Sequence, residues 1–401
     1  MHVLQLVPER LPTSRPDISA LFGKYLPREG IECDIVVGGW TGSFPDEQHF
    51  ASVRRSSGAG GRIRREIAYV WLCLRALAGV DRRGGRVIQV RDTVPFGLLA
   101  LAAARWKRIP FVYWMSFLMS EDRQDRARRD GASRSSVRSA VVSLRGRIEA
   151  ALLYRLLLPA STHVFVQSAG MRDYLTVKGI DASKITPVPM GVDTERLRRD
   201  AVHPRRIEGW EGVPLIVYLG TLDRSRHPEV LIDMLEQVRR RHREARLLLV
   251  GSAHDAPSTQ WVAARARAMG LREAVHITGW LPTEEAWQLI CAADVAVSFI
   301  PRSLVFDVSS PTKLVEYLAL GVPTIANDNP DQESLLRGSG AGWLTASNPA
   351  ALAEAACEIL GDLEAARRRA ARGPAAVESH RSYHRLVPQV AAHYRRLSDR
   401  A

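Results

Sequence analysis

Short apolar segments of strand length alternate with longer helical segments along most of this 401-residue chain. In the first half, the expected strands lie at residues 3–7, 33–37, 87–90, 111–114, 163–167 and 185–187. Helical periodicity fills the intervals, for example at 62–78, where apolar residues recur every three or four positions. Strands that alternate with helices predict an α/β fold with a parallel, doubly wound sheet.

The same alternation starts again near residue 214. Its apolar strands read LIVYLG, RLLLVG, VHITG, VAVSF and TIA, and each is followed by a helical segment. We therefore predict two similar domains, the first over residues 1–200 and the second over residues 201–375. The remaining segment, 376–401, is expected to form a terminal helix.

One segment of the second series, SSPTKLVEYLALGVPTIAND at 309–328, carries several signals at once. Ser310 is expected to cap a helix whose first residue is Pro311, where a missing N–H costs nothing. Gly321 is expected to end that helix before the next strand begins. Lys313 and Glu316 are three residues apart, so they share one face of the helix.

This helix is expected to begin where ligands bind, because ligands of doubly wound sheets lie beyond the carboxyl ends of the strands. Free N–H groups at the helix start and the Lys313 ammonium suit a diphosphate. The Glu316 carboxylate, one turn deeper, suits the two hydroxyls of a ribose. Arg224 and Arg226 follow another strand and are further candidates for phosphate contact, because arginine binds phosphate oxygens bidentately. The alternatives are a surface Lys–Glu pair and a solvated arginine loop.

The chain resembles the retaining GT-B glycosyltransferases of glycosyltransferase family four. The matching stretches occur in the family's order: VPMGVDTERL, VYLGTLDRSR, RLLLVGS, VHITGWLPTEEAWQLICAADVAVS and SSPTKLVEYLALGVPTIA. The first half resembles the family only in layout, through RDTVPFGLLALAAARWKRIPFVYW. The resemblance implies a GT-B fold, in which two Rossmann-like domains face a cleft and the C-terminal helix, residues 376–401, packs back on the first domain. It also implies the transfer of a sugar from a nucleotide-diphosphate donor.

The resemblance also implies roles for residues of the 309–328 segment. Glu316 is expected to bind the ribose of the nucleotide. Lys313 and the backbone amides of Ser309, Ser310 and Thr312 are expected to hold the diphosphate and the donor sugar.

The family's phosphate-binding pair is an arginine directly after a glycine and a lysine five residues later. Here Thr221 follows Gly220, and Arg226 occupies the lysine position. The first arginine is therefore missing, and Arg224 is expected to substitute for it. Leu281 falls where the family's backbone contacts the base.

Two further positions depart from the family pattern. The family's first glutamate is replaced by Val308, and either the adjacent Asp307 reaches the hydroxyls of the donor sugar or this loop is a variant. The histidine that often follows the strand matching FVYW is absent. On the acceptor side we expect Ser116, Glu121 and Arg15 to contribute.

The resemblance implies a front-face substitution in which the departing nucleoside diphosphate takes the proton of the acceptor. The protein then supplies orientation and stabilisation of the leaving diphosphate, and Asp307, Arg226 and Lys313 are the expected catalytic residues. Positive side chains replace a metal ion in this scheme, and the sequence contains no DxD triplet. We expect neither a metal nor another cofactor, and a UDP-sugar or GDP-sugar as the donor substrate.

Positive charge is concentrated in the first half of the chain. Residues 1–200 carry 32 Lys and Arg against 20 Asp and Glu, a net charge of +12, whereas the rest carries 24 against 23. An anionic partner of the first half is therefore expected. The resemblance to the family favours a lipid-linked saccharide acceptor of cell-surface polysaccharide synthesis, reached at an anionic membrane surface. An anionic soluble acceptor is the alternative.

The segment between the strands at 111–114 and 163–167 bears on this membrane hypothesis. Its first part, SEDRQDRARRDGAS, is expected to be a loop. From about residue 137 the pattern is helical, and one side of that helix carries Val141, Leu144, Ile148, Leu152 and Leu156. The helix is either a basic amphipathic surface helix for anionic lipid or an ordinary helix that packs on the core.

The composition bears on the cellular location. Four cysteines lie far apart without metal-ligand spacing, which favours free thiols in a reducing cytoplasm. The first residues lack the features of a signal peptide, and no uncharged apolar run reaches the ~18–20 residues of a membrane span. We expect a cytoplasmic protein, bound peripherally to the inner face of the plasma membrane.

Three other functions agree with parts of the sequence. A nucleotide-sugar epimerase of GT-B fold would need carboxylates and a histidine that converge in the cleft. A non-catalytic nucleotide-sugar-binding protein would fit the departures at Thr221 and Val308. An isoelectric point of about 10.1 suggests nucleic-acid binding. However, the basic residues are not interleaved with exposed aromatics and no known module occurs, so we expect no nucleic-acid partner.

Overall fold

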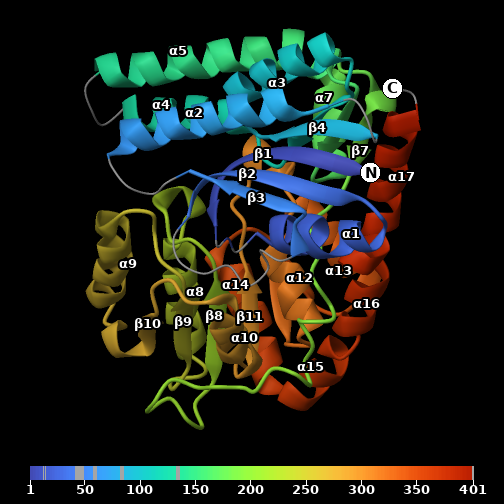
Figure 1. Cartoon of the computed structure of the whole chain (residues 1–401). Helices are drawn as coiled ribbons and strands as arrows, with labels where there is room; N and C mark the ends of the chain where they lie inside the picture. Colours follow the sequence, from blue (N-terminus) through green and yellow to red (C-terminus); the bar gives the residue numbers. More distant parts are fainter. Residues whose placement is uncertain are drawn as a thin grey trace. The chain divides into compact units, whose positions relative to one another are not determined.

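The computed structural model describes residues 1–11, 13, 15–40, 49–56, 61–81, 85–131 and 136–399. They form two compact units, each built on its own parallel sheet (Figure 1). Unit 1 comprises Met1–Pro189 and Leu386–Ala401, and unit 2 comprises Met190–Arg385. The chain therefore passes between the units at residue 190 rather than 200, and returns at residue 386 rather than 376.

Unit 1 contains a seven-stranded sheet in the order β3-β2-β1-β4-β5-β6-β7. Its strands are β1 (His2–Leu11), β2 (Glu32–Trp40), β3 (Ser52–Arg55), β4 (Arg86–Arg91), β5 (Phe111–Met115), β6 (His163–Val166) and β7 (Ile185–Pro187). All neighbouring pairs are parallel. The strand order runs outward from β1 in both directions, which confirms the predicted doubly wound arrangement.

The helices of unit 1 connect consecutive strands. They are η1 (Asp17–Tyr25), α1 (Leu26–Arg28), α2 (Arg62–Gly79), α3 (Val94–Lys107), α4 (Met119–Gly131), α5 (Ser136–Leu152), η3 (Leu153–Leu157), α6 (Leu158–Ala160), α7 (Ala169–Val177) and η4 (Ala182–Lys184). Helices α2, α3, α4 and α5 cover the same side of the sheet (Figure 1). Within the described residues, no helix combines the length and apolarity needed to cross a membrane.

The charged stretch that was expected to be a loop is largely helical. Residues 119–131 form α4, which packs against α5, and residues 132–135 lie outside the described part of the chain. The loop prediction is therefore wrong for 120–131. Its high charge is compatible with a helix because Asp122 pairs with Arg126 one turn later, with Nε and Oδ2 2.7 Å apart.

The C-terminal segment is two helices rather than one. α16 (Gly373–His380) packs on α12 (Thr312–Ala319) within unit 2, and α17 (Tyr383–Asp399) continues into unit 1. In unit 1, the buried Tyr394 hydroxyl donates to Gln89 of β4, and His393 stacks on His163 of β6 with ring centroids 4.5 Å apart. This packing holds the end of the chain on the first sheet.

Unit 2 contains a six-stranded sheet in the order β10-β9-β8-β11-β12-β13. Its strands are β8 (Leu215–Leu219), β9 (Arg246–Val250), β10 (Val275–Ile277), β11 (Val295–Ser298), β12 (Thr324–Asn327) and β13 (Trp343–Thr345). Its remaining helices are η5 (Arg224–Arg226), α8 (Glu229–Arg239), α9 (Ala256–Ala268), η6 (Arg272–Ala274), α10 (Thr283–Cys291), α11 (Leu304–Asp307), α13 (Pro330–Ser339), α14 (Pro349–Gly361) and α15 (Leu363–Ala370). This is again a parallel, helix-covered sheet, as predicted.

The strands of unit 2 are apolar on both faces because each face is covered. Ile216 and Tyr218 of β8 enter one core, whereas Leu215 and Val217 enter another. Successive side chains of a strand point to opposite faces, so a near-continuous apolar run supplies two cores at once.

Candidate active site

A close backbone approach shapes the carboxyl ends of β8 and β9. Gly251 follows β9 with φ +138°, and a Cβ at this position would lie 2.2 Å from Gly220 O, so only glycine fits. Gly220 follows β8, and a Cβ there would lie 3.0 Å from Lys313 Nζ. The small residues therefore let the Lys313 ammonium reach the end of β8.

Helix α12 is tied to the same strand end. The Tyr317 hydroxyl accepts a hydrogen bond from Leu219 N at 2.7 Å. Gly321, at φ +63°, ends the helix as predicted, and Gly321 N donates to Leu318 O at 3.0 Å. Helix α12 is thereby bonded to the carboxyl end of β8.

Ser310 does not cap α12, so that prediction is wrong. The N-cap is Pro311, which supplies no side-chain acceptor. The Ser310 hydroxyl accepts from Met190 N at 3.0 Å and from Arg381 Nη1 at 3.1 Å, and donates to Asp331 Oδ2 at 2.9 Å. The hydroxyl therefore bonds to residues at both ends of unit 2 and to Asp331. The first turn of α12 has no side-chain cap, so its N–H groups and the positive end of its dipole are available to a ligand.

The loop before α12 is held by Phe306 O. Ser309 donates to this carbonyl through its hydroxyl at 2.7 Å and through its amide at 3.2 Å. Asn329 Nδ2 donates to it as well, at 2.8 Å. The Ser309 amide therefore already has an acceptor, whereas Thr312 is the first residue of α12 and is half-buried.

Lys313 lies in a cationic and aromatic environment. Its Nζ is 3.9 Å from the centroid of the Tyr218 ring. Burial and the nearby Arg226 lower the pKa of Lys313 well below its ordinary 10.5, and Glu316 opposes this shift. Two cations that share a partly desolvated site favour an anionic ligand.

Glu316 is oriented by an indole. Trp287 of α10 donates from Nε1 to Glu316 Oε1 at 3.1 Å. Burial raises the pKa of Glu316 to about 7, against the lowering effects of Trp287 and Lys313. One carboxylate oxygen is held by protein, and the group is poised to ionise near neutral pH.

The two arginines that were expected to clamp one diphosphate contact different aromatic rings. Arg226 lies over the Phe306 ring, with its guanidinium carbon 4.4 Å from the centroid, and its charge acts on Lys313. Arg224 lies over the Trp261 ring of α9 at 5.0 Å, and its charge acts on Asp255. The described contacts therefore bring Arg226 towards Lys313, but not Arg224.

Asp307 is engaged in an ion pair. Its Oδ1 accepts from Arg302 Nε at 2.7 Å, and its Oδ2 accepts from Arg302 Nη2 at 3.2 Å. Val308, at the position of the family's first glutamate, is buried. Sequence reasoning missed Arg302, although it lies only five residues before Asp307.

The predicted base-contacting position lies after β10. Leu281 is partly buried and packs on one core of unit 2, whereas the neighbouring Trp280 ring is 69% exposed. The loop therefore holds Leu281 in place while it leaves an aromatic surface open.

Of the three residues that were expected to serve the acceptor, Ser116 and Arg15 belong to a cluster around Asp92. Asp92 Oδ1 accepts from Ser116 N at 2.6 Å, and Oδ2 accepts from the Ser116 hydroxyl. Arg15 Nη1 donates to Ser116 Oγ at 3.3 Å. Asp92 has φ +56°, an uncommon conformation for a non-glycine residue, and burial raises its pKa while Arg91 and Arg15 lower it.

A buried ion network supports this cluster. Arg91 is almost inaccessible, with Nη1 2.6 Å from Asp17 Oδ2 and Nε 3.1 Å from Glu9 Oε1. The sequence analysis did not select Glu9, Asp17, Arg91 or Asp92. The adjacent Arg91 and Asp92, between the end of β4 and the start of α3, could have indicated the cluster. The network fixes the carboxyl ends of β1 and β4.

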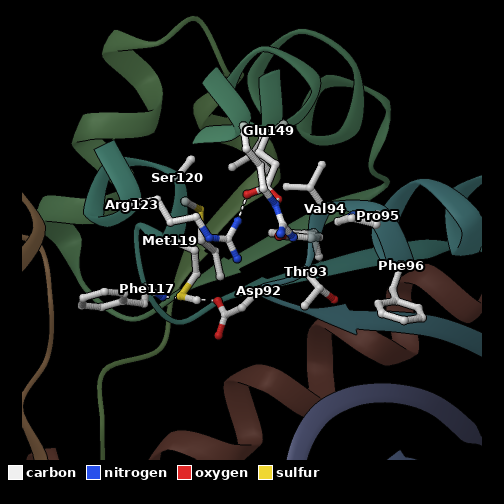
Figure 2. A pocket seen from close by; sticks show the side chains of 14 residues that line it. Asp92, Thr93, Val94, Pro95, Phe96, Phe117, Met119, Ser120, Arg123 and Glu149 are labelled. Atoms are coloured by element: carbon white, nitrogen blue, oxygen red, sulfur yellow. Dashed lines mark hydrogen bonds and ion pairs between the residues drawn. The ribbon is translucent and has the colours of Figure 1, made fainter. Parts of the chain in front are cut away.

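A cavity of about 120 Å³ lies beside Asp92 (Figure 2). Its apolar wall includes Phe96, Phe117 and Met119. Its charged wall consists of Asp92, Arg123, Arg145 and Glu149, and both arginines pair with Glu149. The cavity is therefore amphipathic, which suits a saccharide ring with an apolar face and polar edges.

Glu121 does not join the Asp92 cluster. Its Oε1 accepts from Tyr154 Oη at 2.6 Å and Tyr174 Oη at 3.1 Å, and its Oε2 accepts from Ser120 Oγ at 2.8 Å. These bonds link α4 to η3 and α7, so the described geometry gives Glu121 a packing role. Among the described residues, no three His, Cys, Asp or Glu side chains are grouped to hold a metal ion.

The paired Rossmann-like units define a GT-B glycosyltransferase fold. HepE of Anabaena is similar, with a TM-score of 0.69 and 16% identity over 99% of this chain and 100% of that chain. Sucrose-phosphate synthase of Thermosynechococcus elongatus has a TM-score of 0.72 and 17% identity over 100% of both chains. WaaG, a glycosyltransferase involved in lipopolysaccharide biosynthesis, has a TM-score of 0.68 and 13% identity over 98% of this chain and 99% of that chain.

Family models match both units. Residues 20–196 match the model described as Glycosyltransferase Family 4, and residues 213–362 match the model described as Glycosyl transferases group 1. The chain therefore belongs to the group 1 glycosyltransferases, as the sequence motifs suggested. A comparison with curated protein sequences found no match.

Proposed function

We propose that this enzyme transfers a sugar, with retention of anomeric configuration and without a metal ion, from a UDP-sugar or GDP-sugar to a lipid-linked saccharide. The observation that carries the donor half of the proposal is that Arg226 and Glu316 both act on Lys313, whose Nζ lies beside Gly220 at the carboxyl end of β8. Two cations next to a helix start suit a diphosphate, and a carboxylate one turn deeper suits a ribose.

Each donor-side residue has a distinct proposed role. Lys313, Arg226 and the amides at the start of α12 stabilise the leaving diphosphate, whose oxygen takes the acceptor's proton in a front-face substitution. Glu316 accepts hydrogen bonds from the ribose hydroxyls through the oxygen that Trp287 leaves open. The backbone at Leu281 meets the base.

Two roles need a change of partner on donor binding. Arg224 reaches the diphosphate only if it leaves the Trp261 ring, which is 5.0 Å from its guanidinium carbon. Asp307 can bind the donor sugar if a sugar hydroxyl replaces one of its two contacts with Arg302. Exposed ion pairs contribute about 0–1 kcal/mol, so a sugar hydroxyl can replace one of the Arg302 contacts at little cost.

The uridine nucleotide is favoured by one related structure. HepE has been solved with UDP, with UDP and glucose, and with UDP-glucose. GDP remains the second candidate for this chain.

The acceptor is proposed to bind to unit 1 at the cavity beside Asp92. The Ser116 hydroxyl donates to the Asp92 carboxylate, and Arg15 donates to Ser116 Oγ. The carboxylate then orients an acceptor hydroxyl, while the aromatic wall packs on the sugar ring. An acceptor made in cell-surface polysaccharide synthesis, presented at the inner face of the plasma membrane, fits the positive charge of this half of the chain.

Two measurements test this function. UDP or GDP, but not ADP, should raise the melting temperature of the purified protein, and Glu316→Ala should abolish the shift. If Glu316→Ala leaves it unchanged, the ribose site is wrongly assigned.

Incubation with radiolabelled UDP-sugars and GDP-sugars in the presence of a membrane lipid extract tests the reaction itself. Lipid-soluble label supports the proposal. Free altered sugar indicates an epimerase, and donor binding without turnover indicates a non-catalytic protein.

A further inference from the structure

Helix α2 exposes an apolar stripe. Its exposed large apolar side chains are Ile63, Ile67, Val70, Trp71 and Leu74, with exposed fractions between 37% and 73%. The opposite side of the helix, with Cys73 and Leu77, is buried. The helical pattern that predicted α2 therefore arises mostly from residues that face outward.

Helix α5 and its continuation η3 expose a second stripe. Its members are Val141, Leu144, Ile148, Leu152 and Leu156, between 36% and 62% exposed. This stripe is the one for which the sequence left a surface role and a core-packing role open. The structure places it on the surface, and the buried side of the helix carries Glu149, Leu153 and Leu157 instead.

The two stripes belong to one layer of unit 1. α3 contacts both α2 and η3, and Figure 1 shows α2, α3 and α5 on the same side of the sheet. Lys107 of α3 donates to Ala78 O at 2.7 Å and to Val80 O at 2.6 Å, which ties the end of α3 to the end of α2. Trp106, beside it, is 84% exposed. We call the outer surface of α2, α3, α5 and η3 the outer helix face.

The outer helix face combines these apolar side chains with positive charge. The four helices contain ten Lys and Arg but only two acidic residues, Glu66 and Glu149. Glu149 is buried and paired with Arg123 and Arg145. Arg64, Arg75, Arg147 and Arg155 are exposed. Apolar residues that include tryptophan and are accompanied by arginines are the composition of helices that lie in a lipid interface.

We propose that the outer helix face docks on an anionic lipid bilayer, with the two apolar stripes inserted at the boundary of headgroups and acyl chains. This inference rests on the proposed function, because docking would bring unit 1 to a lipid-linked acceptor. It adds which surface makes the contact, and that the contact is apolar insertion as well as charge attraction.

A second copy of this chain is a less favourable occupant. In a two-fold symmetric contact, each copy presents the same surface to the other. The arginines of one face would then meet those of its copy, and like charges across an interface are unfavourable. Anionic headgroups instead neutralise the arginines while the acyl region takes up the stripes.

Vesicle co-sedimentation of the full-length protein tests the proposal. The variant carries Ile67→Asn, Trp71→Ser, Leu144→Asn and Ile148→Asn. These are exposed positions, and an unchanged melting temperature verifies the fold. The matched control is Trp280→Ser in unit 2, because Trp280 and Trp71 are each 69% exposed.

The wild type should bind vesicles of phosphatidylcholine with phosphatidylglycerol, and bind neutral phosphatidylcholine vesicles more weakly. The variant should bind the anionic vesicles at least ~10-fold more weakly, since four apolar insertions are lost. Trp280→Ser should bind as the wild type does. The proposal is overturned if the wild type does not bind anionic vesicles, or if the variant binds them as tightly as the wild type. It is also overturned if the wild type forms a concentration-dependent dimer that the variant does not form, because the face would then bind a second copy.

A site-specific readout follows from the cysteines. All four native cysteines are buried, so Ile148→Cys offers an exposed thiol for an environment-sensitive dye. Its emission should shift to the blue with anionic vesicles, whereas a dye at Arg272→Cys in unit 2 should not respond. Equal responses would contradict insertion through this face.

Failure of this inference and failure of the proposed function are distinguishable. Stabilisation by UDP or GDP without vesicle binding rejects only the docking surface. Vesicle binding without stabilisation by either nucleotide rejects only the donor assignment.

Discussion

Trp287 Nε1 lies 3.1 Å from Glu316 Oε1 and donates a hydrogen bond to it, so an indole on α10 orients the carboxylate on α12. The bond occupies one oxygen and leaves the other for a ligand. It also stabilises the charged form of a carboxyl group whose pKa burial raises to about 7. The two residues lie 29 positions apart in the sequence.

Trp287→Phe should weaken nucleotide binding while it retains most of the ring packing. The loss of one hydrogen bond to a carboxylate predicts a rise of about 3- to 10-fold in the Kd for UDP, measured by calorimetry. Trp343→Phe is the matched control, because Trp343 Nε1 donates to Glu358 at 2.7 Å in the same unit. Equal effects of the two substitutions would contradict a specific role for Trp287.

Glu316→Gln should change how stability depends on pH. The folded-state pKa of Glu316 is about 7, against an ordinary 4.5, so the native state binds this proton more tightly than the unfolded state. This tighter proton binding stabilises the native state fully below pH 4.5, and the stabilisation is lost as the pH rises through 7. The free energy of unfolding of Glu316→Gln relative to wild type should therefore rise by about 1–3 kcal/mol between pH 5 and pH 8. Urea unfolding at several pH values measures this, and a difference that does not vary with pH would refute the shifted pKa.

Lys313 should take up protons when a nucleoside diphosphate binds. Its pKa is lowered by burial and by Arg226, and an anion beside it restores the charged form. Calorimetry in buffers of different ionisation enthalpy should show uptake of up to ~1 proton per UDP at pH values above the lowered pKa of Lys313. Lys313→Met should abolish the uptake and weaken binding ~10-fold or more. Lys178→Met, in unit 1, should change neither quantity.

Asp307→Asn should separate turnover from nucleotide binding. If the carboxylate serves the donor sugar, we expect kcat to fall ~100-fold while stabilisation by UDP is retained. Arg302→Gln removes the ion-pair partner but keeps the carboxylate, so it should retain most of the turnover. If both variants are less stable but each folded molecule turns over as fast as the wild type, the Asp307–Arg302 pair has only a structural role.

Asp92→Asn should impair use of the acceptor without affecting the donor. Asparagine tolerates the positive φ of this position, so the fold should persist. We expect kcat/KM for the acceptor to fall ~10-fold or more, with an unchanged UDP-induced melting shift. Asp92→Ala should in addition lower the free energy of unfolding by about 1–3 kcal/mol, because Ser116 N loses its buried acceptor. An acceptor kcat/KM that is unaffected in Asp92→Asn would remove the cavity from consideration.

Much of the fold was predictable because alternation of strands and helices is a local pattern. The parallel sheets and Gly321 as a helix end follow from it directly. Short elements with weak patterns were missed, namely β3 (Ser52–Arg55) and β13 (Trp343–Thr345). The predicted cap failed at Ser310 because three partners from distant parts of unit 2 compete for its hydroxyl.

The sequence by itself determined the layered α/β architecture and the spacing of Lys313 and Glu316, since periodicity and helical geometry are properties of neighbouring residues. Tertiary structure decided which charges meet. In the folded protein Arg226 acts on Lys313, Arg224 lies over Trp261, and Asp307 pairs with Arg302. Tertiary structure also decided that the apolar stripe on α5 faces outward. The same helical pattern is compatible with an exposed stripe and with a stripe packed on the core, and burial depends on which other helices cover it.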